Sequence, residues 1–197
     1  MYQRAIIFAG YHQPGAFLTY TPQANDLILC ADAGYALCLQ MGVVPHKVLG
    51  DFDSIDKTSI PKELLLSYPA EKDDTDTMLC VRYAKEQGCR ECMILGGIGG
   101  RIDHTIANLQ ALAFAHQSGM RASMRDGKDM AFLLEKGEQA FAKEENAAIS
   151  LFAYTERCEG VFISGVKYPL RDAVLTQSFP LGVSNQFASD AARVAVR

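Results

Sequence analysis

Three polar clusters in the first half of the chain carry the residue types of phosphate and metal chemistry. They occupy residues 50–54, 72–76 and 96–104. The first two are rich in aspartate, and the third is a glycine-rich turn that carries Arg101 and His104. Mg²⁺ prefers oxygen ligands and usually bridges one or two carboxylates to substrate phosphates. The combination therefore predicts phosphoryl or pyrophosphoryl transfer.

The acidic residues follow expected strands and helix starts. Asp51 and Asp53 lie directly after an expected strand, one residue apart, so both side chains can point to the same side. Open parallel sheets bind ligands outside the carboxyl ends of their strands. Asp32 also follows an expected strand and is a candidate to bind a ribose hydroxyl or to shape the site. Asp73 and Asp76 bracket an expected helix start, where one of them could instead serve only as an N-cap.

The glycine turn at residues 96–100 is predicted to hold phosphate. Its four glycines let backbone N–H groups approach an anion, and the following helix adds the positive end of its dipole. Arg101 can hold phosphate oxygens in a planar fork. The turn does not match GxGxxG, because Ile102 stands where the third glycine should be, and no GxxxxGK[ST] loop is present. The alternative is a tight strand-to-helix turn that merely requires glycine.

Apolar runs alternate with helical patterns through the first part of the chain, which predicts βαβ units and a parallel sheet. We expect strands at 4–10, 27–31, 47–50, 92–95 and 121–125, helices at 33–41 and 75–87, and a third helix from Asp103 or Thr105 to about Gly119. Asp74 or Thr75 can cap the second helix.

After Asp126 the pattern changes to short apolar stretches separated by turn residues, with little helical periodicity. The stretches lie at 130–134, 148–153, 160–164, 173–176 and 194–196. This pattern is typical of a small antiparallel β-domain. We therefore expect an α/β domain over residues 1–126 and a β-domain over residues 127–197.

Composition and charge exclude several classes of protein. Hydrophobic residues make up 49% and charged residues 21% of the chain, as in ordinary globular proteins. A net charge of −4 without a basic stripe weighs against nucleic-acid binding. No apolar stretch approaches the roughly 18 residues of a membrane helix, and the first residues lead into an expected strand rather than a signal peptide. We expect a cytoplasmic protein without membrane or nucleic-acid partners.

Four of the six cysteines lie within apolar runs, which fits buried thiols in a reducing compartment. Cys89 and Cys92 have the spacing of half a zinc site or of a redox motif. No second CxxC or paired histidine follows. We therefore expect a helix-to-strand corner at which both side chains face inward.

In order and spacing, these clusters resemble those of the thiamine pyrophosphokinase family. The matching stretches are 31–34, 44–54, 72–76 and 96–108, followed by 165–170 and 182–185 in the second half. The resemblance implies a Rossmann-like α/β domain over residues 1–126 that binds ATP and Mg²⁺. It also implies an antiparallel β-sandwich over residues 127–197 that binds thiamine and forms a homodimer, with each active site shared between two subunits.

The resemblance further implies transfer of diphosphate from ATP to thiamine, giving thiamine diphosphate and AMP. The implied catalytic residues are Asp51, Asp53, Asp73, Asp76, Arg101 and Asp103, with Asp51, Asp53 and Asp73 as Mg²⁺ ligands. The implied nucleotide-binding residues are Asp32, Lys72, Thr75, Gly99, Gly100, Arg101 and His104. The implied thiamine-binding residues are Tyr168, Ser184 and Asn185. Tyr168 stands where animal relatives carry tryptophan.

Two alternative functions remain open at this point. One is an ATP-dependent pyrophosphotransferase that acts on a different alcohol, and the pair Ser184 and Asn185 weighs against it. The other is a non-catalytic nucleotide-binding sensor domain. The intact set of acids weighs against a sensor, because a sensor has no need for several carboxylates of the Mg²⁺-binding type.

Overall fold

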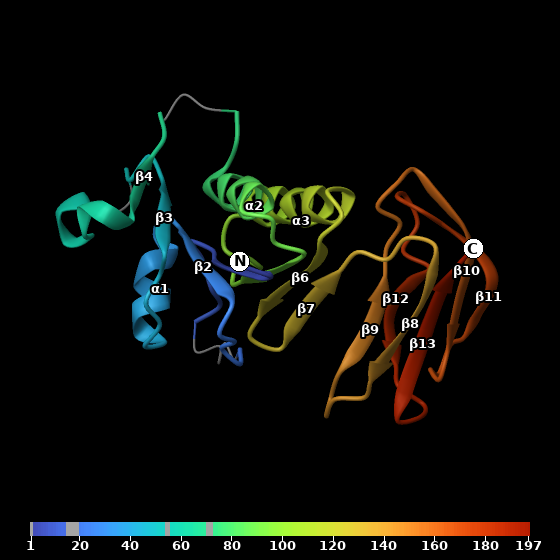
Figure 1. Ribbon diagram of the computed structural model, residues 1–197. Coiled ribbons are helices and arrows are strands. Elements are labelled where there is room, and N and C mark those ends of the chain that lie inside the picture. Colours follow the sequence, from blue (N-terminus) through green and yellow to red (C-terminus); the bar gives the residue numbers. More distant parts are fainter. Residues whose placement is uncertain (1, 15–19, 54–55, 70–72) are drawn as a thin grey trace. The chain divides into compact units, whose positions relative to one another are not determined.

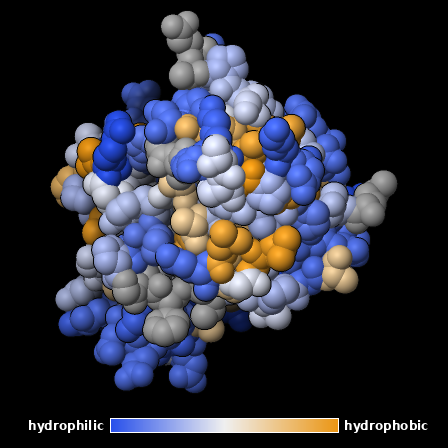
Figure 2. Space-filling view, turned by 90° about the vertical axis from the view of Figure 1, so that its left-hand side faces the viewer, coloured by the Kyte–Doolittle hydropathy of each residue, from blue (hydrophilic) through white to orange (hydrophobic). Residues whose placement is uncertain are grey.

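The computed structural model describes residues 2–14, 20–53, 56–69 and 73–197. The chain forms two compact units, Met1–Leu133 and Leu134–Arg197 (Figure 1). Among the described residues, no helix is both long enough and apolar enough to cross a membrane. On the face shown in Figure 2, most side chains are hydrophilic and the apolar ones gather in small groups, which is ordinary for a folded surface.

Unit 1 is built on a seven-stranded sheet in the order β4-β3-β2-β1-β5-β6-β7. Its strands are β1 (Arg4–Phe8), β2 (Asp26–Ala31), β3 (Lys47–Gly50), β4 (Leu65–Ser67), β5 (Glu91–Leu95), β6 (Arg121–Asp126) and β7 (Asp129–Phe132). All neighbouring pairs are parallel except β6 and β7. The chain builds outward from β1 to β4 and then crosses to the other side of β1 for β5. The strand order therefore reverses between β1 and β5, where open sheets form their ligand crevice.

Helices cover both faces of this sheet. They are α1 (Gly34–Gln40), α2 (Asp76–Glu86) and α3 (Ile102–Gln117), with short 3₁₀ turns at Lys57–Ser59 and Lys62–Leu64. Helices α2 and α3 lie side by side and pack on the face that carries Ile7 and Leu29 (Figure 1). Helix α1 packs on the opposite face, against Phe8 and Ile28. Successive strand residues alternate between these two cores, so the central strands are apolar throughout.

The predicted parallel sheet is confirmed, and most elements lie within two residues of their expected bounds. Strand β3 has the expected bounds, and Thr75 caps α2 by accepting a hydrogen bond from the Met78 N–H at 3.3 Å. The predicted cap of α3 is wrong: Arg101 is its N-cap, and the Thr105 hydroxyl bonds Gly99 instead. Strand β4 was not predicted, since it has only three residues, none of them fully buried.

The stretch at residues 130–134 was expected in the second domain, but it forms β7 of the first sheet. Gly127, with φ of 60°, allows a two-residue turn that pairs Asp126 with Asp129. The predicted boundary at 126/127 falls inside this hairpin, so unit 1 extends to Leu133.

Unit 2 contains two antiparallel sheets. The order of the larger is β11-β10-β13-β8, and the smaller pairs β12 with β9. The strands are β8 (Gly137–Ala142), β9 (Ala148–Leu151), β10 (Arg157–Ser164), β11 (Leu170–Thr176), β12 (Gly182–Gln186) and β13 (Ala191–Val196). Ile149 and Leu151 of β9 pack against a core formed by Ile163, Ala192 and Val194. The two sheets thus share one small core, in the sandwich-like arrangement that was expected.

The two cysteines of the CxxC segment are buried at the start of β5. Burial raises the pKa of the Cys89 thiol to about 11 and that of the Cys92 thiol to about 12. Both side chains belong to the core on the face of the sheet that α2 and α3 cover. This supports the interpretation of the segment as an inward-facing corner.

Candidate active site

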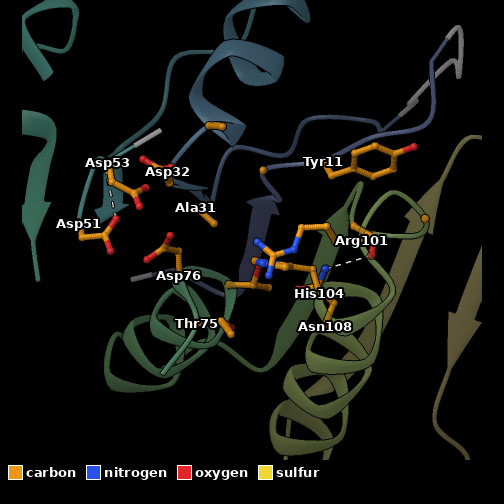
Figure 3. Close-up of a pocket in the computed structure, with 15 residues that line it drawn as sticks. Tyr11, Ala31, Asp32, Asp51, Asp53, Thr75, Asp76, Arg101, His104 and Asn108 are labelled. Atoms are coloured by element: carbon orange, nitrogen blue, oxygen red, sulfur yellow. Dashed lines mark hydrogen bonds between the residues drawn. The ribbon is translucent and has the colours of Figure 1, made fainter. Parts of the chain in front are cut away.

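A cavity of about 450 Å³ opens at the carboxyl ends of the central strands of unit 1 (Figure 3). Its volume suits a small molecule. It is lined by Gly10, Tyr11, Ala31, Asp32, Ala33, Asp51, Asp53, Thr75, Asp76, Thr77, Gly97, Gly99, Arg101, His104 and Asn108. Eight of the residues predicted from the sequence are among them: Asp32, Asp51, Asp53, Thr75, Asp76, Gly99, Arg101 and His104. The lining as a whole comes from five separate segments of the chain, which the fold brings together.

Four carboxylates, those of Asp32, Asp51, Asp53 and Asp76, form one side of the cavity, which we call the acidic wall (Figure 3). Phe52 lies between two of them, is buried, and has a left-handed φ of 60°. Such a φ is strained for a bulky residue. With Phe52 in the core, Asp51 and Asp53 both face the cavity, and the Asp53 N–H donates to Asp51 Oδ1 at 3.3 Å.

Gly50, the last residue of β3, leaves the space in which the other two acids approach each other. A Cβ at this position would lie 3.1 Å from the Cβ of Asp32 and 3.4 Å from the Cγ of Asp76. Asp32 follows β2 with φ of 43°, and Asp76 is the first residue of α2. The acidic wall thus depends on Gly50, because a side chain at this position would crowd Asp32 and Asp76.

Arg101 and His104 lie on the other side of the cavity, across from the acidic wall (Figure 3). Arg101 forms an exposed ion pair with Asp103, 2.6 Å between Nη2 and Oδ2. The hydrogen bond from Arg101 holds the pKa of Asp103 below its usual value. Asp103 does not line the cavity, so the structure places it as the partner of Arg101. The ion pair is intact at pH values above the ordinary aspartate pKa, and it is lost as the pH falls through the lowered pKa of Asp103.

The four glycines of the turn all have positive φ, between 64° and 100°. Three of their N–H groups bond within the protein. Gly96 donates to the Arg125 carbonyl at 2.8 Å, Gly97 to the Tyr11 carbonyl at 2.6 Å, and Gly99 to Thr105 Oγ1 at 3.0 Å. Most of the glycine N–H groups that were expected to bind an anion therefore form hydrogen bonds within the protein, and these bonds shape the turn. Arg101 and His104, which line the cavity, are then the candidates to meet an anion.

Tyr11 and Asn108 line the cavity but were not singled out from the sequence. The ring of Tyr11 packs on Gly100, where a Cβ would approach it to 2.8 Å. Asn108 is buried in α3 and donates from Nδ2 to the Gly97 carbonyl at 3.0 Å. A polar residue within an apolar helix stretch could have marked Asn108, whereas no sequence signal marks Tyr11.

Asp126 is a further residue that the sequence did not reveal, because Asp126 and Gly127 together resemble an ordinary turn. Its carboxylate is fully buried at the end of β6. Oδ1 accepts the Gln13 N–H at 2.9 Å and Oδ2 accepts the Ile98 N–H at 3.1 Å. One carboxylate therefore ties the loop after β1 to the glycine turn, the two loops that carry Tyr11 and Gly97.

The remaining predicted residues of unit 1 lie elsewhere. Asp73 is exposed and, like Gly100, does not line the cavity, and Lys72 lies outside the described residues. Within the described part of the chain, no three acidic, histidine or cysteine side chains gather closely enough to hold a metal ion. Mg²⁺ needs only one or two protein carboxylates when phosphates supply further oxygens. Asp51 and Asp53 fit that requirement.

The predicted thiamine-side residues lie together in unit 2. Tyr168 is 62% exposed, while Asn185 is buried and bonds the main chain of Tyr168. Ser184 has a left-handed φ of 59°, and its N–H donates to Ser150 Oγ at 3.0 Å. An exposed aromatic ring beside a strained backbone marks a candidate binding surface.

We expect Asp126→Asn to loosen both loops, since an amide nitrogen would then face a main-chain N–H. The free energy of unfolding of the variant should be about 1–3 kcal/mol lower, and the amide hydrogens of Gln13 and Ile98 should exchange faster. Asp129→Asn is the control, because among the described residues Asp129 accepts a hydrogen bond from the Gln13 side chain alone. Equal exchange rates at both positions in the two variants would contradict this role for Asp126.

Two family models match the two halves of the chain. Residues 19–124 match the thiamin pyrophosphokinase catalytic domain, and residues 136–197 match the thiamin pyrophosphokinase vitamin B1 binding domain. The chain is 31% identical over 175 residues to the thiamine pyrophosphokinase of Bacillus subtilis (strain 168), covering 86% of this chain and 82% of that protein.

Solved structures show the same likeness. The crystal structure of thiamine pyrophosphokinase from Bacillus subtilis matches with a TM-score of 0.86 at 26% identity, covering 98% of this chain and 94% of that one. A thiamin pyrophosphokinase family protein from Enterococcus faecalis matches with a TM-score of 0.79, also at 26% identity, covering 98% and 93%. On the matched domains, the identity and the shared fold, the chain belongs to the thiamine pyrophosphokinase family.

Proposed function

We propose that this protein transfers the diphosphate group of ATP to the hydroxyl of thiamine, giving thiamine diphosphate and AMP. The observation that carries the proposal is the cavity of unit 1, in which the acidic wall faces Arg101 and His104. This arrangement suits a metal-bound polyphosphate whose oxygens need both a cation and hydrogen-bond donors. Family membership supplies thiamine as the acceptor.

Each side of the cavity has its own part in the transfer. Mg²⁺, when bound with the triphosphate, would neutralise the charge that develops on the phosphates, with Asp51 and Asp53 as its protein ligands. Arg101 would exchange Asp103 for phosphate oxygens, which its planar fork also fits. Asp76 and Asp32 would complete the acidic wall, and Asp32 would bind a ribose hydroxyl. The protein then acts chiefly by positioning its substrates.

Thiamine would bind to unit 2 through Tyr168 and Ser184, with Asn185 beside them. The thiazolium cation suits an aromatic face, and the aminopyrimidine edge suits small polar groups. We further propose a C2 homodimer in which each thiamine lies between the acidic wall of one subunit and Tyr168 of the other. The family resemblance supports this arrangement.

The direct test is to incubate the protein with thiamine, ATP and Mg²⁺ and to separate the products by chromatography. Equal amounts of AMP and thiamine diphosphate are expected, with neither product when thiamine or Mg²⁺ is omitted. ADP with thiamine monophosphate would instead show single phosphoryl transfer. Formation of AMP only with another alcohol would identify a different acceptor, and tight ATP binding without turnover would identify a sensor.

Asp53→Asn should lower kcat by about a hundredfold or more and leave folding intact, because it weakens the Mg²⁺ ligand set. The loss should be largest at limiting Mg²⁺. Asp56→Asn is a control from the same segment, since Asp56 accepts hydrogen bonds from Thr58 and does not line the cavity. A normal rate for Asp53→Asn at limiting Mg²⁺ would remove Asp53 from the metal site.

Arg101→Lys keeps the charge but loses the planar fork, so kcat/KM for ATP should fall about tenfold while KM for thiamine stays the same. Arg82→Lys is the matched control, because Arg82 also forms an ion pair, with Asp74, outside the cavity. If Arg101→Ala retains the full kcat/KM for ATP, Arg101 does not bind phosphate and the glycine turn is structural.

A complementation experiment tests the shared site. One chain carries Asp53→Asn, and the other carries Tyr168→Ala with Asn185→Ala. Mixed dimers should regain activity, because one of their two sites carries neither lesion. Verified mixed dimers that stay as inactive as their parents would show that each site is built within one chain.

A further inference from the structure

In unit 2, the main chain of Tyr168 is held by the side chain of Asn185. Asn185 Nδ2 donates to the Tyr168 carbonyl at 2.6 Å, and the Tyr168 N–H donates to Asn185 Oδ1 at 3.0 Å. These partners fix the orientation of the amide, because its oxygen must face an N–H and its nitrogen a carbonyl. One buried side chain therefore satisfies both main-chain groups of Tyr168.

The two bonds extend a short antiparallel pairing between residues 165–168 and 185–188. The Lys167 N–H donates to the Gln186 carbonyl at 2.9 Å, and the Ala188 N–H donates to the Gly165 carbonyl at 2.9 Å. At Tyr168 the Asn185 side chain takes the place of a main-chain partner, with Nδ2 as the donor and Oδ1 as the acceptor. The backbone of Tyr168 is thus fixed, although the residue is 62% exposed.

A bulge in β12 turns Asn185 inward. Gly182 pairs with Leu151 and Asn185 pairs with Ile149, so β12 advances three residues while β9 advances two. In a regular strand, Gly182 and Asn185 would face opposite sides of the sheet, yet both are buried. The left-handed φ of Ser184, within the bulge, accounts for this change of side.

We propose that Asn185 is a positioning residue, which presents the Tyr168 ring to the substrate and does not itself contact the substrate. The proposal rests on the proposed function for the identity of that substrate. The Lys167 ammonium lies over the ring, 5.4 Å from its centroid, so a cationic heterocycle would stack on the opposite face. A ring that is already held in place binds without the cost of ordering it.

A double-mutant cycle separates positioning from direct contact. Asn185→Ala should raise KM for thiamine about tenfold in the chain that has Tyr168, with KM for ATP unchanged. In a Tyr168→Ala background the same change should have almost no further effect, since no ring remains to be positioned. The same tenfold loss in both backgrounds would show that Asn185 contacts thiamine directly and would overturn the proposal.

A fluorescent reporter tests the same proposal without any substrate. The chain contains no tryptophan, so Tyr168→Trp introduces a single indole at position 168. Asn185→Ala and Asn185→Asp should each lower the fluorescence anisotropy of that indole, because Ala removes both bonds and Asp turns an oxygen toward the carbonyl. Gln186→Ala is the control, because the Gln186 side chain is exposed beside Asn185.

The two measurements separate the possible failures. If the protein with its natural sequence forms no AMP with thiamine, the proposed function fails, while the anisotropy still decides whether Asn185 holds residue 168. Unchanged anisotropy in both Asn185 variants, with unfolding temperatures that show folded protein, would overturn the proposal. Lowered anisotropy together with the background-dependent KM effect would support it.

Discussion

The first strand of the chain must be the centre of its sheet, and the arrangement of unit 1 follows from that constraint. All residues of β1 after Arg4 are fully buried, and parallel strands pair with it on both sides. A parallel sheet can be extended on both sides of its first strand only if the chain crosses over that strand. The crossing from β4 to β5 places the loop that follows β5 beside the loop that follows β1, and residues of both loops line the cavity.

The charges in the cavity are divided between its two sides. The acidic wall brings four carboxylates together, and such a group gains from a cation that neutralises it. Arg101, on the other side, is paired with Asp103 in the first turn of α3. In the proposed function, a phosphate would replace Asp103 while Mg²⁺ met the acids, so that a metal-bound polyphosphate would match both sides at once. Neither the metal nor the polyphosphate alone would do so.

Much of this site could be predicted from local sequence patterns. Apolar runs that end at aspartates predicted β2 and β3, and Thr75 predicted the start of α2. The parts that were not predicted depend on contacts between distant residues. Tyr11 meets Gly100, and Asp126 meets Gln13 and Ile98, only after the sheet has formed. Local pattern also could not show that a bulge would turn Asn185 inward, or that the glycine N–H groups would be used within the protein.

The buried carboxylate of Asp126 has a consequence for the order in which the site is completed. It bonds a loop that precedes it by 113 residues, and it belongs to one of the last strands of unit 1 to be synthesised. Contacts so distant in sequence form late, because closing a long loop costs chain entropy. A chain emerging from the ribosome can therefore pair β1 with β2 well before the loop that carries Tyr11 is fixed. Competence to bind nucleotide would then arise in one late step, when β6 joins the sheet.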